Sequence, residues 1–314
     1  MTFSVVFPGQ GSQSVGMLAD LSAEFPVVGA SFAECADVLG KDLWALAQSG
    51  PAEALSDTRV TQPLMFTADI AVWRCLREKG LPMPVAIAGH SLGEFAALVA
   101  ADVLSFEDGL KLVGKRAELM AGAVAEGEGG MAALIGMDDE SVVELCASLS
   151  GERITEAVNF NAPGQVAISG HLDALEKTCE LAREKGARKA MMLPVSVPNH
   201  SSLMRGAGEQ LAEMIDATSF SQPSVPVVQN ASATAAASVD ELVASLKQHV
   251  YSPVRWTQTI QALIANYGVA TVIESGPGKV LTGLGKRIDR SVPTLSVESP
   301  ESLNAAIDAV NTAA

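Results

Sequence analysis

The feature that most constrains the fold is a tight, glycine-flanked turn between two apolar segments. Residues 85–89 (VAIAG) have the composition of a buried strand, and residues 92–101 have that of an alanine-rich helix. The sequence GHSLG at 89–93 lies between them. A G-x-S-x-G sequence in this context indicates a nucleophile elbow, in which the serine hydroxyl points out at the carboxyl edge of a parallel sheet. We therefore expect Ser91 to be a nucleophile.

The segments around this turn alternate between strand-like and helix-like patterns. The apolar run at 3–7 (FSVVF) precedes Pro-Gly and predicts a strand, and residues 62–79 and 107–125 predict helices. Such alternation is typical of a parallel sheet with helices on both faces. The same alternation resumes after residue 200, with helices at 201–217 and 253–267, strands at 269–274 and 294–297, a glycine-rich loop entering a helix at 275–287, and a final helix.

A segment with a different order of predicted strands and helices separates these two stretches. It predicts strands at 131–137, 154–159, 165–169 and 188–195, helices at 138–149 and 171–186, and a turn at 161–164. The order β-α-β-β-α-β is that of a ferredoxin-like unit. We therefore expect an α/β protein with a large domain formed by residues 1–126 and 198–314, and an inserted small domain at 127–197.

Composition and charge exclude several classes of protein. The 314 residues are 48% hydrophobic and 18% charged, which is typical of a globular chain, and the net charge is −15. So acidic a chain is not expected to bind nucleic acid or an anionic membrane. Its four cysteines are widely spaced, so we expect reduced thiols, no metal site and a cytoplasmic protein. No signal peptide and no membrane span are expected either.

A nucleophilic serine needs a general base, and four histidines are candidates. His90 lies inside the elbow, and His171 begins a predicted helix of the insert. His200 follows the insert, where the chain returns to the large domain and a cleft between domains is expected. His249 lies at the end of a predicted helix. Spacing alone ranks His200 first and His249 second.

Two other segments offer groups for a site around Ser91. The loop FPGQGSQ at 7–13 follows the first strand but lacks phosphate-loop spacing. It is either a simple turn or a source of a backbone N–H, that of Gln10, which would join the N–H of Leu92 in an oxyanion hole. Arg116 lies on a predicted helix, where it is either solvated or aimed at a substrate carboxylate.

An ordered set of motifs connects these residues to a known family. FPGQGSQ, GHSLGE, GKRAELM, VPNH, SPVRW and SGPGKVLTGLGKR follow one another along nearly the whole chain. Together they resemble the malonyl-CoA:acyl carrier protein transacylases of bacterial type II fatty acid synthesis. The set is also similar to the acyltransferase domains of polyketide synthases. The resemblance implies a hydrolase-like large domain with a nucleophile elbow and a ferredoxin-like insert.

The resemblance also implies roles for individual residues. Ser91 would be the nucleophile and His200 its base, Arg116 would hold the substrate carboxylate, and the Gln10 and Leu92 backbones would bind the oxyanion. In this family a backbone carbonyl orients the histidine, at a position that commonly carries Gln. The best match here is His249, with Gln248 one residue earlier. Met120 and Asn161 are expected to complete the substrate-binding set.

The implied activity is transfer of malonyl from malonyl-CoA to the phosphopantetheine thiol of acyl carrier protein, through a seryl intermediate and without metal or redox cofactor. Two basic clusters, with Arg188 and Lys189 in one and Lys286 and Arg287 in the other, are candidates to bind the carrier protein or CoA phosphates, and a monomer is expected. The alternatives are a stand-alone polyketide acyltransferase and, less favoured, an esterase, which should carry an acid and then a histidine late in the chain. A non-catalytic scaffold should have lost Ser91 or His200, and both are present.

Overall fold

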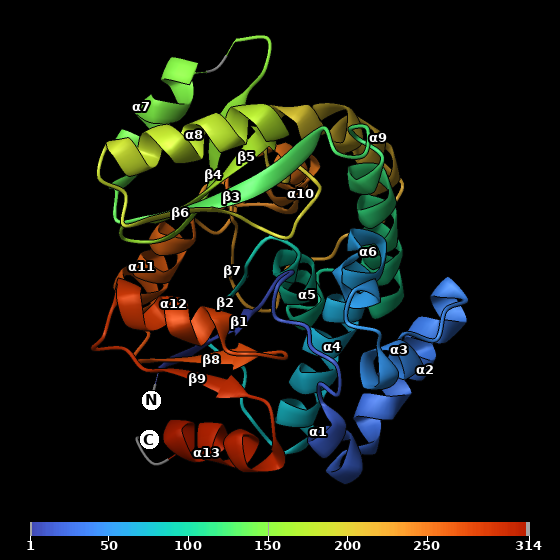
Figure 1. Ribbon diagram of the computed structural model, residues 1–314. Coiled ribbons are helices and arrows are strands. Elements are labelled where there is room, and N and C mark those ends of the chain that lie inside the picture. Colours follow the sequence, from blue (N-terminus) through green and yellow to red (C-terminus); the bar gives the residue numbers. More distant parts are fainter. Residues whose placement is uncertain (1, 150, 312–314) are drawn as a thin grey trace.

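Two sheets organise the chain. The computed structural model describes residues 2–149 and 151–311. Its larger sheet has five parallel strands in the order β7-β2-β1-β8-β9. The smaller sheet has four antiparallel strands in the order β4-β5-β3-β6. Figure 1 shows the small sheet and its two helices above the larger sheet, so the chain has the two-part α/β architecture expected from its sequence.

The elements outside the small sheet are these. The strands are β1 (Phe3–Phe7), β2 (Ala86–Gly89), β7 (Val227–Val228), β8 (Thr271–Ser275) and β9 (Thr294–Val297). The helices are α1 (Ala19–Glu24), α2 (Pro26–Leu39), α3 (Leu43–Ser49), α4 (Thr58–Glu78), α5 (Gly93–Ala100), α6 (Phe106–Ala121), α9 (Arg205–Asp216), α10 (Val239–Gln248), α11 (Trp256–Tyr267), α12 (Val280–Ile288) and α13 (Pro300–Asn311). Short 3-10 turns lie at Ala54–Ser56, Ser202–Met204 and His249–Tyr251.

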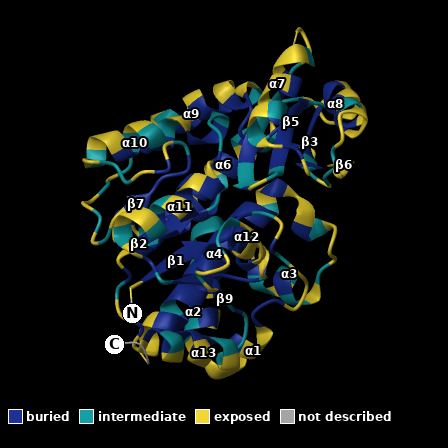
Figure 2. Ribbon diagram, turned by 90° about the vertical axis from the view of Figure 1, so that its left-hand side faces the viewer, coloured by how far each residue is buried: buried dark blue, intermediate teal, exposed yellow. Residues whose placement is uncertain are grey.

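Helices cover both faces of the parallel sheet. Val5 and Phe7 point to one face, into a core built mainly by α2, α4, α5 and α6. Val6 points to the other face and packs with residues of α11 and α12, among them Trp256. Strands β1 and β2 are therefore dark blue, or buried, in Figure 2, and β8 is buried along its whole length, whereas the two central residues of the edge strand β9 are half-buried. Burial on both faces explains why these strands read as continuous apolar runs.

The inserted unit has the predicted β-α-β-β-α-β order. Its elements are β3 (Gly129–Ile135), α7 (Asp139–Leu149), β4 (Thr155–Ala162), β5 (Gln165–His171), α8 (Leu172–Glu184) and β6 (Lys189–Met192). Ala132, Val166 and Leu175 belong to a separate apolar core between this sheet and its helices. All six elements fall within the small domain predicted at 127–197, whose boundaries stay a prediction.

A backbone connection joins the small sheet to the large one. The N–H of Val254 donates to Val158 O of β4 at 2.7 Å, and the N–H of Phe160 donates to Val254 O at 2.9 Å. Val254 lies two residues before the start of α11, so this edge of β4 is tied to a helix of the large sheet. The two sheets thereby face a common space, which contains the candidate site.

Several boundaries differ from the sequence expectation. Strand β4 continues to Ala162, because a two-residue turn at 163–164, with Gly164 at φ +70°, suffices to reverse the chain. Strand β6 ends at Met192, close to Pro194, which has no N–H for a ladder. The first turn after residue 201 is 3-10 rather than α-helical. No helix in the described part of the chain is both long and apolar enough to cross a membrane.

Candidate active site

The turn at 89–93 has the geometry of a nucleophile elbow. Ser91 has φ +50°, in the left-handed region that non-glycine residues avoid. A Cβ on Gly93 would lie 2.1 Å from Phe7 O, and one on Gly89 would lie 1.9 Å from the Gly93 carbonyl carbon. Both positions therefore require glycine, because α5 passes directly against the ends of β1 and β2. The elbow expected from the sequence is confirmed.

The Ser91 hydroxyl contacts a histidine that follows the insert in the sequence. Ser91 Oγ lies 2.6 Å from His200 Nε2. The other ring nitrogen, Nδ1, lies 3.1 Å from His249 O and 2.9 Å from Ser252 O. Since carbonyl oxygens only accept hydrogen bonds, Nδ1 carries the proton and the lone pair of Nε2 faces the serine. The geometry thus brings together the first-ranked histidine and the expected His249 carbonyl, and it adds the carbonyl of Ser252.

The environment keeps His200 neutral. Its side chain is buried, and its backbone, at φ +64°, is fixed by a hydrogen bond from its N–H to Val250 O at 3.1 Å. Burial, with a smaller contribution from the charge of Arg116, lowers the pKa of His200 to about 3. A neutral imidazole can accept a proton, so His200 is in the protonation state that a general base needs at neutral pH.

Arg116 reaches the same hydroxyl from α6. One terminal nitrogen donates to Ser91 Oγ at 3.2 Å, and the other donates to Gln62 Oε1. The Gln62 amide in turn donates to Thr58 Oγ1 at 3.0 Å, which fixes its orientation on α4. Burial lowers the pKa of Arg116 to about 9, so the guanidinium stays charged at neutral pH. A fixed cation beside the nucleophile favours an acyl group that carries a negative charge.

Two backbone N–H groups are available near Ser91. Gln10 and Leu92 both line the cavity at the serine, and in residues 2–149 and 151–311 neither backbone N–H has a hydrogen-bond partner. The N–H of Ser91 itself is occupied, since it donates to Asn230 Oδ1 at 2.7 Å. The Gln10 side chain is held by Thr58 Oγ1, 3.2 Å from Gln10 Oε1. This arrangement is the one that the sequence predicts for an oxyanion hole.

A cavity of about 180 Å³ surrounds these groups. The elbow after β2 contributes His90 and Ser91, helix α6 contributes Arg116, and the small sheet contributes Asn161 among others. The Asn161 Oδ1 atom lies 2.8 Å from His90 Nε2, so it connects the two halves of the cleft. The volume is below the 300–1,000 Å³ that a drug-sized ligand occupies, so the enclosed part fits a short acyl group.

Met120 does not reach this cavity. Its side chain is buried on α6, and its sulfur lies 3.7 Å from Gln62 Nε2. The sequence predicts direct contact with substrate, whereas the structure places Gln62 between Met120 and Arg116. The position of Met120 therefore supports an indirect role, through the side chain that orients the arginine.

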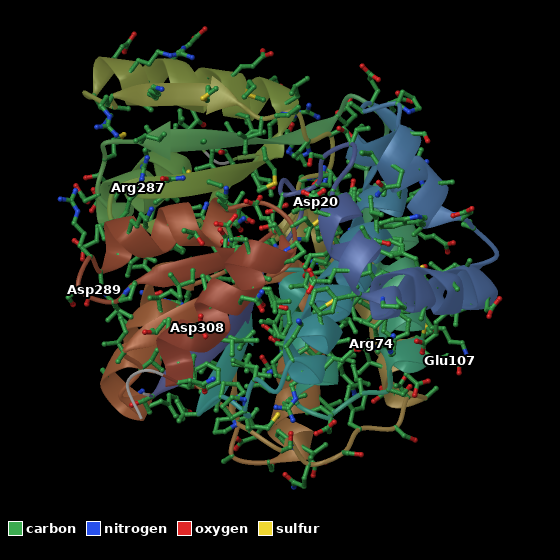
Figure 3. The ribbon with its side chains drawn as sticks, turned by 90° about the horizontal axis from the view of Figure 1, so that it is seen from below. Asp20, Arg74, Glu107, Arg287, Asp289 and Asp308 are labelled. Carbon is green, nitrogen blue, oxygen red and sulfur yellow. The ribbon has the colours of Figure 1, made fainter. Side chains whose placement is uncertain are left out.

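One residue of each basic cluster can be placed relative to the cleft, which Gln165 lines. Arg287, on the last turn of α12, donates to Gln165 Oε1 at 2.7 Å. Gln165 pairs with Ile135 across the small sheet, and Ile135 pairs with Lys189. Two strand spacings, about 10 Å, therefore separate Lys189 from the residue that binds Arg287. In Figure 3, Arg287 lies where the orange helices meet the green strands of the small sheet.

Comparison with known proteins places this site in a family. The family described as "Acyl transferase domain" matches residues 4–300. The chain belongs to this family. It is 46% identical over 305 residues to the malonyl CoA-acyl carrier protein transacylase of Salmonella typhimurium, covering 97% of this chain and 98% of the relative.

Comparison with solved structures gives the same family. The crystal structure of FabD from Acinetobacter baumannii has 46% identity and a TM-score of 0.96, covering 100% of this chain and 99% of that one. A malonyl-transacylase in complex with its type II polyketide acyl-carrier protein has 45% identity and a TM-score of 0.96, covering 98% of this chain and all of that one. The expected acyltransferase family is thus confirmed.

The sequence analysis missed four residues of this site. Gln62 and Thr58 lie one turn apart on α4, and the available signal was the polar side chain of Gln62 directly before the apolar run at 63–66. Asn230 follows β7, a strand of two residues that is too short for any periodicity to reveal. Ser252 contributes only a carbonyl, and every residue has one.

Proposed function

We propose that this chain transfers the malonyl group of malonyl-CoA to the phosphopantetheine thiol of acyl carrier protein, through a malonyl ester on Ser91, and so supplies fatty acid synthesis. The observation that carries the proposal is the position of Arg116, 3.2 Å from Ser91 Oγ beside a neutral His200. An acyl group on Ser91 would place its free carboxylate against this guanidinium. The names of the relatives support the same substrate and partner.

In the first half-reaction, His200 Nε2 takes the proton of Ser91 as the serine oxygen attacks the thioester carbonyl. The Oγ–C bond forms, and the developing oxyanion is bound by the N–H groups of Gln10 and Leu92. The carbonyls of His249 and Ser252 stabilise the imidazolium that forms, because they accept its Nδ1–H. When the C–S bond breaks, His200 returns its proton to the CoA sulfur.

The second half-reaction reverses these steps with another thiol. The phosphopantetheine thiol loses its proton to His200 and attacks the malonyl ester, and Ser91 leaves with the proton from His200. No step requires a metal or a redox cofactor. Arg116 holds the carboxylate throughout, so its contribution is to both the binding and the placement of the acyl group.

The basic residues Arg188, Lys189, Lys286 and Arg287 are proposed to bind the acidic carrier protein or the phosphates of CoA. With a net charge of −15, the chain needs a local patch to attract an acidic partner. Arg287 hydrogen-bonds to Gln165, which lines the cleft that holds Ser91, so a carrier protein bound there could deliver its thiol on a flexible arm. We also propose a cytoplasmic monomer, since one chain supplies the whole site and the four cysteines are buried and form no disulfide.

A polyketide carrier protein is the alternative partner, supported by the similar malonyl-transacylase solved with one. A hydrolase is disfavoured because His200 precedes the last third of the chain and Arg116 is aimed at the acyl group. The test follows malonyl-CoA consumption with and without holo carrier protein. Consumption that requires the carrier and yields malonyl-carrier supports the proposal, whereas carrier-independent release of malonate contradicts it.

A further inference from the structure

We propose that Asn230 and Glu94 position the nucleophile: the Asn230 side-chain amide acts as a short extension of strand β7 that holds the strained backbone of Ser91, and Glu94 fixes the orientation of that amide. This inference rests on the proposed function only in assuming that Ser91 is the nucleophile. Both residues are buried, and neither lines the cavity.

The contacts of Asn230 imitate a parallel strand. Its Oδ1 accepts from Ser91 N at 2.7 Å, and its Nδ2 donates to Gly89 O at 2.6 Å. A residue of a parallel strand makes such a pair of bonds with the residues on either side of its neighbour; here that neighbour is His90. The backbone pairing between β2 and β7 ends at the pair formed by Ala88 and Val228. The amide therefore continues the ladder one step further, where the chain has already begun to turn.

Glu94 determines which way the amide faces. The same Glu94 oxygen, Oε2, accepts from the backbone N–H of Asn230 at 2.7 Å and from its Nδ2. Since Glu94 Oε2 already accepts from a backbone N–H, it is also an acceptor toward the side chain, so the Asn230 nitrogen points toward Glu94 and the oxygen toward Ser91. Asn230 itself is anchored by Arg255, whose N–H donates to Asn230 O at 3.0 Å.

The hydrogen bonds from Asn230 and Glu94, which we call the clamp, offset the conformational free-energy cost of the Ser91 backbone. A non-glycine residue in the left-handed region costs on the order of 1–3 kcal/mol and persists only where its surroundings enforce it. Ser91 has φ +50°, and its N–H would otherwise be unpaired beside the cavity. The clamp also keeps the Ser91 N–H out of the oxyanion hole, which leaves that role to Gln10 and Leu92.

The informative substitution is Asn230→Asp, which keeps the shape and the acceptor for Ser91 but loses the donor toward Gly89 and Glu94. The titratable and charged groups facing this position are Glu94, His249, whose Nε2 lies 3.8 Å from Glu94 Oε2, and Arg116, whose charge acts on Glu94. We expect the first-turnover acylation rate by malonyl-CoA to fall about 10- to 100-fold, as for a misplaced catalytic group, with KM changed less than the rate. Ser232→Ala, on the same loop but exposed, is the matched control and should leave both unchanged.

Two further readouts separate positioning from mere stability. The ratio of the Asn230→Asp rate to the wild-type rate should rise as the pH is lowered from 8 to 5.5, because the introduced carboxyl group regains a donor when it is protonated. The double variant Asn230→Asp/Glu94→Gln should recover part of the rate at neutral pH, because it removes the like charge of Glu94 beside the new carboxylate and the Gln amide can donate to that carboxylate. The recovery should be incomplete, because the same atom then no longer accepts from the backbone N–H at position 230. This variant also carries the test if the single variant does not fold.

Labelling of Ser91 by a fluorophosphonate gives the same comparison without malonyl-CoA or carrier protein. Slower labelling of folded Asn230→Asp, with the pH response and the partial recovery, supports the clamp even if malonyl transfer itself were not observed. Wild-type labelling rates in Asn230→Asp and in Asn230→Ala would overturn it. A slower rate whose ratio to wild type is independent of pH and is not recovered by Glu94→Gln would also overturn it.

Discussion

At the scale of single residues, the site combines a neutral base with a buried cation. Ser91 Oγ lies 2.6 Å from His200 Nε2 and 3.2 Å from a terminal nitrogen of Arg116. Burial, and after it the charge of Arg116, lowers the pKa of His200, so the cation that would bind the substrate carboxylate also contributes to keeping the base unprotonated. Acyl selectivity and base function are thereby coupled through one side chain.

Arg116→Ala should discriminate between acyl groups. A charge-assisted contact contributes about 1.5–3 kcal/mol, so kcat/KM for malonyl-CoA should fall at least about 10- to 100-fold. Acetyl-CoA has no carboxylate and should lose little or gain. Arg116→Lys should restore only part of the malonyl activity, because lysine lacks the bidentate fork. The measurement is kcat/KM with both thioesters, and an equal loss for both would remove the carboxylate assignment.

The His249 side chain makes a separate contribution, to the pH dependence of stability. Within the described residues its ring nitrogens make no hydrogen bond of normal geometry, and Nε2 lies 3.8 Å from Glu94 Oε2. Burial, and after it the charge of Arg116, holds the pKa of His249 well below its usual value. Below about pH 6.5 the unfolded chain therefore binds a proton at this residue that the folded chain does not, and stability is lost as the pH falls.

His249→Gln removes this pH-dependent loss of stability. Relative to wild type, its free energy of unfolding should rise by up to about 1.4 kcal/mol per pH unit as the pH falls below about 6.5. Urea unfolding of both proteins from pH 7.5 to 5.5 measures the difference. A difference that is constant with pH would mean that His249 is protonated in the folded protein as well.

At the scale of elements, the elbow depends on how closely α5 packs on two strands. The order of strand, turn and helix could be predicted from residues 85–101, because buried parallel strands and alanine-rich helices have distinct compositions. The histidine could be ranked first because the insert ends next to it. The partner of the Ser91 backbone could not be found, because Asn230 follows a strand of two residues and reaches the elbow through tertiary packing alone.

Gly93→Ala tests the close packing. Its Cβ would lie 2.1 Å from Phe7 O, a backbone atom that cannot move independently of β1. We expect a loss of about 1–3 kcal/mol or more in the free energy of unfolding. Gly29→Ala is the control, since Gly29 lies within α2 with nothing within 4 Å of the added Cβ and should gain about 0.4–1 kcal/mol. Equal stability of the two variants in urea titrations would contradict the tight contact.

At the scale of the whole molecule, the insert turns an edge of the parallel sheet into a cleft, with Arg287 hydrogen-bonded to Gln165 of its lining. The family and the two-part architecture could be predicted because the motifs occur in order along the whole chain. The approach of Lys189 to the residue that binds Arg287 could not be predicted, because it depends on the sheet register that links Gln165, Ile135 and Lys189, and on the hydrogen bond from Arg287.

Reversing the charge at Lys286 and Arg287 should weaken carrier binding. We expect Lys286→Glu/Arg287→Glu to raise the apparent KM for acyl carrier protein, and more strongly at low salt, because screening reduces interactions between exposed charges. Lys41→Glu is the control, at an exposed position between α2 and α3. An apparent KM unchanged for both carrier protein and malonyl-CoA would exclude Lys286 and Arg287 from the docking surface.

The central claim is that Ser91 carries a malonyl group between two thiols. The most direct measurement is mass spectrometry of the protein after mixing with malonyl-, methylmalonyl- and acetyl-CoA together. We predict malonyl on the peptide containing Ser91, none on Ser91→Ala, and its loss from the enzyme with appearance on holo carrier protein when that is added. Label that persists on Ser91→Ala, or a malonyl-enzyme that decays only to malonate in the presence of carrier, would contradict the account.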